Sequence, residues 1–319
     1  MTKSPFAFVF PGQGSQSVGM LNAWGDHPEV KAALHEASDA LGEDLGLLIE
    51  QGPKEALGLT TNTQPVMLVA AVAAYRVWMA EVGHSPNYVA GHSLGEYSAL
   101  VASNALTLTQ AVPLVRLRAQ AMQEAVPVGT GAMAAILGME SQKVVAICQE
   151  VTISMGNPSQ DLVEAVNFND PLQTVIAGSK LAVEKACEAL KAAGAKRALP
   201  LPVSAPFHCS LMKPAAEKLK DKLHDTNIAT PTIALINNID VKIESQPEAI
   251  RDALYRQAFG PVRWVETIQK MASLNIVNIV ECGPGKVLAG MVKRINPDLA
   301  GHALFDPTSL QEVKTNLMG

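Results

Sequence analysis

Gly91-His92-Ser93-Leu94-Gly95 lies between an apolar run, Tyr88-Val89-Ala90, and a helix-like segment, Glu96–Val101. A strand, a sharp turn and a helix form the usual setting of a nucleophilic serine. Glycines suit this turn because a side chain would clash where the strand folds back into the helix. The amides after the serine lie at a helix N-terminus, where they can stabilise an oxyanion. The pattern predicts a nucleophile at Ser93; an accidental turn is the alternative.

The composition outside this stretch is that of a compact globular protein. The chain has 319 residues, of which 48% are hydrophobic and 17% charged, and its net charge is −5. This content excludes a disordered chain, and the acidic balance does not favour a nucleic-acid partner. The length predicts one large domain with a smaller piece rather than two equal halves.

Sequence features give no sign of a metal site or a membrane segment. The four cysteines, Cys148, Cys187, Cys209 and Cys282, are far apart and form no ligand pattern. We therefore expect reduced thiols, no metal and no redox cofactor. The apolar run Phe6–Phe10 is too short for a signal peptide, and Arg76 interrupts the run Val66–Tyr75. The chain is expected to be cytoplasmic, with no membrane partner.

Strands and helices alternate along most of the chain, which predicts an α/β fold with a mainly parallel sheet covered on both faces. The expected strands of this body are 6–10, 87–91 and 275–281, and the expected helices are 64–82, entered at Pro65, 94–103 and 110–125.

Residues 130–201 follow a different pattern. The expected order is strand 132–137, helix 141–151, strands 163–167 and 174–177 joined by a turn at Asn169-Asp170-Pro171, helix 180–193 and strand 198–203. This β-α-β-β-α-β order is typical of a ferredoxin-like unit. We therefore expect a ferredoxin-like α+β subdomain over 130–201, inserted into a body formed by 1–129 and 202–319.

One charged residue breaks the pattern of helix 110–125. Arg118 lies near the middle of the apolar face, and a guanidinium in a core is costly unless it is paired. It could form an ion pair with a buried carboxylate, extend to the surface, or bind a substrate carboxylate through two parallel hydrogen bonds.

A serine nucleophile needs a general base, and His208 is the candidate. It follows the last strand of the inserted unit, within Ala205-Pro206-Phe207-His208-Cys209. His92 adjoins the serine and could form a hydrogen bond there instead. Adjacent Cys209 and His208 rarely adopt attack geometry, so we discount a thiol nucleophile. No acidic residue stands out as the orienting third member, which leaves a backbone carbonyl as one possibility.

Two glycine-rich turns follow predicted strands. Pro11-Gly12-Gln13-Gly14-Ser15 lies where sites form at the carboxyl edge of a sheet, but it lacks the dinucleotide pattern. Gly283-Pro284-Gly285-Lys286 lacks the spacing of a phosphate-binding loop and is interpreted as a structural turn.

Together these motifs resemble a known family. Phe8–Ser15, Gly91–Tyr97, Arg116-Leu117-Arg118, Pro206-Phe207-His208 and Glu281–Gly285 occur in the order found in malonyl-CoA:acyl carrier protein transacylases of bacterial fatty-acid synthesis. The resemblance covers nearly the whole chain. It implies a hydrolase-like α/β body with a ferredoxin-like insert.

The resemblance also implies roles for the residues around the serine. Ser93 would carry the malonyl group as an ester, and His208 would be the base. The backbone carbonyl of Gln257 would orient this histidine. The amides of Gln13 and Leu94 would form the oxyanion hole.

Further positions match substrate-binding residues of the family. Arg118 would bind the free malonyl carboxylate, His92 would flank the site, and Asn167 and Asn169 would lie near the substrate. Phe207 resembles the phenylalanine of malonyl-selective acyltransferases, where enzymes for branched units tend to have serine. A ring there leaves less space for an α-methyl group, as does the branched side chain of Leu94.

The implied reaction is ping-pong transfer from malonyl-CoA to the phosphopantetheine thiol of acyl carrier protein, by an enzyme expected to be a monomer. A serine esterase or thioesterase shares the serine and histidine but does not need an arginine in the acyl pocket. A non-catalytic carrier-binding module is the third possibility. Because carrier proteins are acidic, a basic patch is expected near the cleft. The candidates are Lys196, Arg197, Lys286, Lys293 and Arg294. The alternative is that these side chains only form a solvated face.

Overall fold

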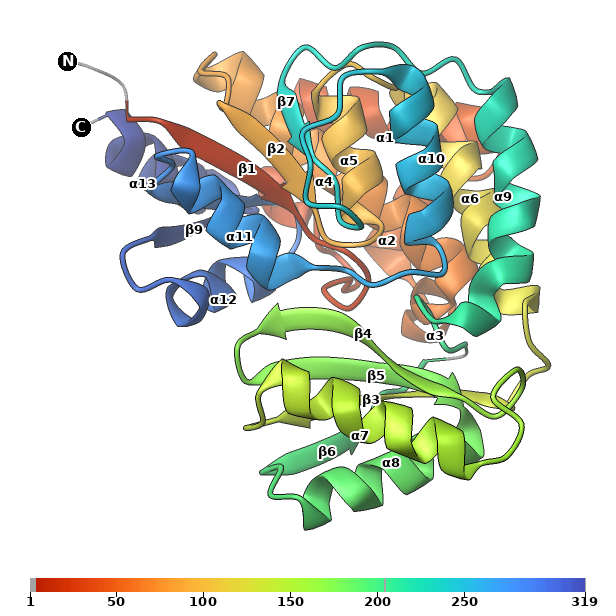
Figure 1. The fold of residues 1–319 in the computed structure, drawn as a ribbon. Helices are drawn as coiled ribbons and strands as arrows, with labels where there is room; N and C mark the ends of the chain where they lie inside the picture. Colours follow the sequence, from red (N-terminus) through yellow and green to blue (C-terminus); the bar gives the residue numbers. More distant parts are fainter. Residues whose placement is uncertain (1–3, 204, 319) are drawn as a thin grey trace.

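A five-stranded parallel sheet forms the centre of the larger body in the computed structural model, which describes residues 4–203 and 205–318 (Figure 1). The strand order is β7-β2-β1-β8-β9, and every neighbouring pair is parallel. The strands are β1 (Phe6–Phe10), β2 (Tyr88–Gly91), β7 (Ala234–Ile236), β8 (Asn278–Cys282) and β9 (Ala300–Leu304).

Helices cover both faces of this sheet. On the central strand, Phe6, Phe8 and Phe10 face one hydrophobic cluster, and the alternate residues Ala7 and Val9 face another. Side chains alternate along a strand, so a strand buried on both faces is apolar throughout. The first cluster includes α1 (Pro28–Leu41), α4 (Thr60–Glu81), α5 (Gly95–Ala102), α6 (Leu108–Glu124), α9 (Lys213–Asp225), α10 (Pro247–Gln257) and α13 (Pro307–Met318); the second includes α11 (Trp264–Ser273) and α12 (Val287–Ile295). Short helices α2 (Leu45–Gln51) and α3 (Lys54–Gly58) precede α4.

The inserted unit is a separate antiparallel sheet below the larger body (Figure 1). Its strand order is β4-β5-β3-β6, which with two helices gives the predicted ferredoxin-like arrangement. Its elements are β3 (Gly131–Leu137), α7 (Ser141–Ser154), β4 (Val163–Asp170), β5 (Gln173–Ser179), α8 (Lys180–Ala192) and β6 (Arg197–Pro200). Ala134 and Ile136 pack with the two helices, while Met133 and Ala135 pack on the opposite face near Cys209.

Three expected boundaries in the larger body are wrong by two or more residues. Helix α6 begins at Leu108 rather than at 110, because Thr107 and Gln110 form a capping box. Helix α4 begins at Thr60 rather than at 64, because the backbone amides of Asn62 and Thr63 donate to the Leu59 carbonyl at 2.8 and 2.7 Å and form a helical turn ahead of Pro65. Strand β8 begins at Asn278 rather than at 275. Asn275 has a φ of 61° and belongs to the turn that ends α11.

Several expected boundaries differ in the inserted unit, among them the end of α7, which is Ser154 rather than 151. Asn169 and Asp170 belong to β4, so the hairpin turn consists of Pro171 and Leu172, whose amide donates to Asp170 Oδ1 at 2.9 Å. The last strand ends at Pro200 instead of 203. The two sheets are linked where Asn167 of β4 bridges Val262 and Asp170 pairs with Arg294 of α12 at 2.8 Å. In the described ranges no helix is both long and apolar enough to cross a bilayer.

Candidate active site

The turn between β2 and α5 requires its two glycines. A Cβ on Gly91 would lie 1.8 Å from the carbonyl carbon of Gly95, and a Cβ on Gly95 would lie 2.0 Å from the carbonyl oxygen of Phe10. Both contacts are with backbone, which cannot move aside. Ser93 at the tip has a φ of 53°, a left-handed conformation that is costly for a side chain. The predicted strand–turn–helix is therefore present.

Asn238 fixes this turn from the loop that follows the neighbouring strand β7, and it was not identified from sequence. Its Oδ1 accepts from the Ser93 amide at 2.7 Å, and its Nδ2 donates to the Gly91 carbonyl at 2.5 Å. The side chain is fully buried. Two asparagines directly after the short apolar run Ala234–Ile236 were the available signal, because the ends of parallel strands meet at one edge.

His208 lies between the serine and a backbone carbonyl. Its Nε2 is 2.7 Å from Ser93 Oγ, and its Nδ1 is 2.9 Å from the carbonyl oxygen of Gln257. A carbonyl only accepts, so Nδ1 carries the proton and Nε2 is free to accept from the serine. The hydrogen bond to Gln257 expected from the resemblance is thus present. Burial, and then the charge of Arg118, lower the pKa of His208 to about 3, which keeps it neutral.

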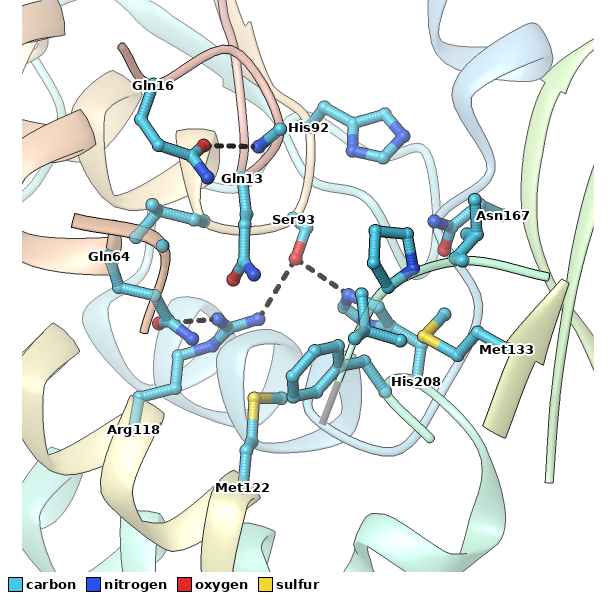
Figure 2. A pocket seen from close by; sticks show the side chains of 17 residues that line it. Gln13, Gln16, Gln64, His92, Ser93, Arg118, Met122, Met133, Asn167 and His208 are labelled. Atoms are coloured by element: carbon cyan, nitrogen blue, oxygen red, sulfur yellow. Dashed lines mark hydrogen bonds between the residues drawn. The ribbon is translucent and has the colours of Figure 1, made fainter. Parts of the chain in front are cut away.

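Arg118 reaches the same serine from α6. It is 2% exposed, and its Nη2 donates to Ser93 Oγ at 3.2 Å while Nη1 donates to Gln64 Oε1 at 2.8 Å (Figure 2). No carboxylate of the described residues pairs with it directly, so neither the ion pair nor the surface arginine considered above is present. Burial lowers its pKa, but an arginine remains protonated. Gln64, which ends in the cavity, was not identified from sequence.

Gln257 contributes its side chain as well as its carbonyl. Its Oε1 accepts from Arg118 Nη2 at 3.1 Å, and its Nε2 donates to the Ser93 carbonyl at 3.0 Å and to Glu96 Oε2 at 2.9 Å. Glu96 is 1% exposed, and burial raises its pKa to about 7. Sequence reasoning gave Glu96 no role, although a carboxylate in the otherwise apolar α5 was a signal.

A cavity of about 550 Å³ opens over the serine. Figure 2 shows Ser93 at its centre, with Arg118 and His208 reaching the hydroxyl from two sides. Gln13 and Leu94 also line the cavity. In the part of the chain that the structure describes, the amides of these two residues form no hydrogen bond, so both are available to an incoming oxygen.

The inserted unit forms one wall of the cavity with Met133, Asn167 and the loop 201–203. Oδ1 of Asn167 is buried and has no partner among the described residues. His92 Nε2 donates to Asn169 Oδ1 at 2.8 Å, so this nitrogen carries a proton and cannot act as a base. Phe207 lines the cavity next to His208 and packs against the core of both units.

Other candidates lie outside the site. Cys209 is buried and its thiol donates to the Pro206 carbonyl, while burial raises its pKa to about 12. Gly283-Pro284-Gly285-Lys286 forms a turn in which both glycines have positive φ. The five basic candidates are exposed, but Arg294 is already paired with Asp170. Within residues 4–203 and 205–318 no cluster of His, Cys, Asp or Glu could bind a metal.

Comparisons with known proteins identify the family of this chain. The model of the acyl transferase domain family matches residues 7–296. A malonyl CoA-acyl carrier protein transacylase of Escherichia coli (strain K12) is 52% identical over 96% of this chain and 97% of that protein. One of Bacillus subtilis (strain 168) is 44% identical over 97% of this chain and 96% of that protein.

Solved structures share the whole fold. The acyl-carrier-protein S-malonyltransferase of Burkholderia pseudomallei 1710b superimposes with a TM-score of 0.94 at 59% identity, covering 98% of this chain and 99% of that one. A malonyl-transacylase in complex with a type II PKS acyl carrier protein also gives a TM-score of 0.94, at 50% identity over 98% of this chain and all of that one.

Proposed function

This chain belongs to the acyl transferase family, and from that premise we propose that it moves a malonyl group from malonyl-CoA to acyl carrier protein through an ester on Ser93. The enzyme is an acyltransferase that supplies malonyl units for fatty-acid synthesis. The observation that carries the mechanism is the Ser93 hydroxyl, which contacts a neutral histidine and a buried arginine at the same time.

In the first half-reaction, Ser93 Oγ attacks the thioester carbonyl and His208 Nε2 takes its proton. The amides of Gln13 and Leu94 stabilise the oxyanion. The C–S bond then breaks, and His208 returns the proton to the departing coenzyme A thiolate. In the second half-reaction the phosphopantetheine thiol of the carrier protein attacks the ester in the same way.

Arg118 gives the site its preference for an acyl group with a free carboxylate. A malonyl carboxylate would take the two parallel N–H bonds of the guanidinium and draw it away from Ser93 Oγ. It would also offset the positive charge that helps to depress the pKa of His208. The bound substrate would therefore make this histidine a stronger base. A plain esterase has no use for such an arginine.

The walls of the cavity fit the rest of the substrate. The buried Oδ1 of Asn167 needs a donor, and an amide N–H of the pantetheine arm would supply one. Phe207 restricts the space beside the acyl group. We further infer that the enzyme acts in the cytoplasm as a monomer, without a metal or redox cofactor and without nucleic-acid or membrane partners; light scattering on the purified protein tests its oligomeric state.

The direct test is the intact mass of the protein after mixing with malonyl-CoA alone, with Ser93→Ala as control. We expect an adduct of one malonyl group that the control lacks and that holo-acyl carrier protein discharges. Continuous release of coenzyme A without an adduct would mean that water is the acceptor, as in an esterase. Failure of Ser93 to react at all would favour a binding module.

A further inference from the structure

Glu96 is a buried carboxyl next to the reacting groups, and the mechanism above gives it no role. It lies on α5, three residues after Ser93, and is 1% exposed. Its Oε2 accepts two hydrogen bonds, one from the backbone N–H of Asn238 at 3.0 Å and one from the side-chain Nε2 of Gln257 at 2.9 Å. Burying a carboxyl is costly unless it is bonded, so its place beside the nucleophile requires an explanation.

Both partners of Glu96 hold catalytic groups. Asn238 bonds the Ser93 amide and the Gly91 carbonyl, and therefore holds the strained turn. Gln257 bonds His208 through its backbone carbonyl. One carboxyl oxygen thus ties the segment carrying the nucleophile to the segment orienting the base, although these segments are distant in the sequence.

The charge of Glu96 also fixes which way the Gln257 amide faces. A carboxylate only accepts, so the NH2 end of the amide must face Glu96 and the oxygen end must face Arg118. A reversed amide would place its oxygen against the carboxylate and its NH2 group against a guanidinium. Glu96 therefore sets the acceptor that holds Arg118.

We propose that Glu96 is a positioning residue that aligns both the Ser93–His208 pair and Arg118 through Asn238 and Gln257. The inference extends the proposed function, since the alignment serves acyl transfer to Ser93. Charge-assisted hydrogen bonds are about twice as strong as neutral ones, so the alignment depends on the ionised carboxylate.

The surroundings of Glu96 place its titration in an accessible range. Burial raises its pKa to about 7; the bonds from Gln257 and Asn238 and the charge of Arg118 oppose this, and Asp240 adds to it. Tyr97 also faces this region, but its pKa is raised to about 12. Because the pKa of His208 is about 3, that residue does not titrate near neutral pH in the free enzyme.

The test is the pH dependence of Ser93 acylation in Glu96→Gln, measured at malonyl-CoA concentrations below saturation, so that the rate reports the ionisations of the free enzyme, in which His208 does not titrate near neutral pH. In the unaltered enzyme the single-turnover rate should fall as pH drops through about 7, because protonation removes the charge. In Glu96→Gln the rate should be lower by about 10- to 100-fold, the size of loss seen when a side chain that orients a metal ligand is replaced. The pH profile of this variant should lack the inflection. The affinity for malonyl-CoA should weaken too, because Arg118 then lacks an aligned acceptor.

Glu281→Gln is the matched control. Glu281 is also fully buried, with a pKa raised to about 7, but it bonds the amide of Ala289 away from the serine. This variant should keep the inflection. An inflection that persists in Glu96→Gln, or that disappears in both variants, would overturn the proposal. The proposal would also be overturned if the rate loss in Glu96→Gln were explained by a lower melting temperature, that is, by partial unfolding of the variant.

A fluorophosphonate probe separates this inference from the proposed function. Ser93 Oγ displaces fluoride from phosphorus while His208 takes the proton, so labelling needs the aligned pair but no malonyl group. If malonyl-CoA forms no ester while labelling keeps its dependence on Glu96, the proposed function fails and the positioning role stands. If Glu96→Gln does not fold, the labelling rate of the unaltered enzyme is measured instead. A rate that stays constant between about pH 6 and 8 overturns the proposal, and a rate that falls towards pH 6 supports it.

Discussion

The parallel sheet and the antiparallel sheet contribute different things to one cavity. Every group bonded to Ser93 comes from the larger body: His208, Arg118, Asn238 and the Gln257 side chain. The smaller sheet contributes walls, such as Met133 and Asn167. The difference teaches that bond making depends on one unit and the choice of substrate on both, so the two properties should respond to different substitutions.

The strongest test on the larger body is His208→Ala. It should lower the rate of Ser93 acylation by about 10²- to 10⁴-fold, because the serine loses its proton acceptor. The loss should be the same for malonyl-CoA and acetyl-CoA, as measured by rapid quench and mass spectrometry. A loss confined to one acyl group would contradict the role of His208 as a base.

Arg118→Ala should separate the two acyl groups. Malonyl transfer should fall by about 10²- to 10³-fold, which corresponds to removing one partner of a buried ion pair. Acetyl transfer should be spared, because acetyl has no carboxylate to bind. The measurement is kcat/KM for both thioesters, and equal losses would refute the assigned role.

Phe207→Ser tests selection at the junction of the two units. A smaller side chain should raise kcat/KM for methylmalonyl-CoA about tenfold or more, because one methyl group is worth about 1–3 kcal/mol. Malonyl transfer should change less than this. If malonyl transfer fell as strongly as after His208→Ala, the residue would belong to the chemistry and the contrast between the units would fail.

The smallest effect is expected from charge reversal on the smaller unit. Lys196→Glu with Arg197→Glu should raise the KM for acyl carrier protein by a few fold and leave the KM for malonyl-CoA unchanged, since exposed charges mainly steer encounter. Lys31→Glu on α1 is the control. If the docking patch includes neither Lys196 nor Arg197, the KM for acyl carrier protein and the KM for malonyl-CoA will both stay unchanged.

The sequence alone was sufficient for the main outlines of both units. The glycine spacing around Ser93, the strands expected at 6–10 and 87–91, and the β-α-β-β-α-β order depend on local patterns, and local patterns can be recognised in a single chain. Arg118 was identifiable because a charge on an apolar helix face is anomalous. The resemblance, not the pattern, pointed to the carbonyl of Gln257.

What could not be predicted depends on contacts between distant segments. Asn238, Gln64 and Glu96 are ordinary residues locally, and only the packed fold brings them to the serine. Strand β7 has three residues and β9 is an edge strand containing Gly301 and His302, so neither shows a strong period-2 pattern. The start of α4 was missed because a helical turn with its own backbone hydrogen bonds precedes Pro65, although proline is usually found at the first position of a helix.

The backbone at the two reacting residues has a consequence for the evolution of this enzyme. Ser93 and His208 have φ values of 53° and 66°, conformations that cost about 1–3 kcal/mol each outside glycine. Selection for stability alone would replace them, so a Ser93→Gly variant should be inactive and yet melt at a higher temperature than Ser93→Ala. Turnover in this fold is thus maintained against a standing thermodynamic pressure to lose it.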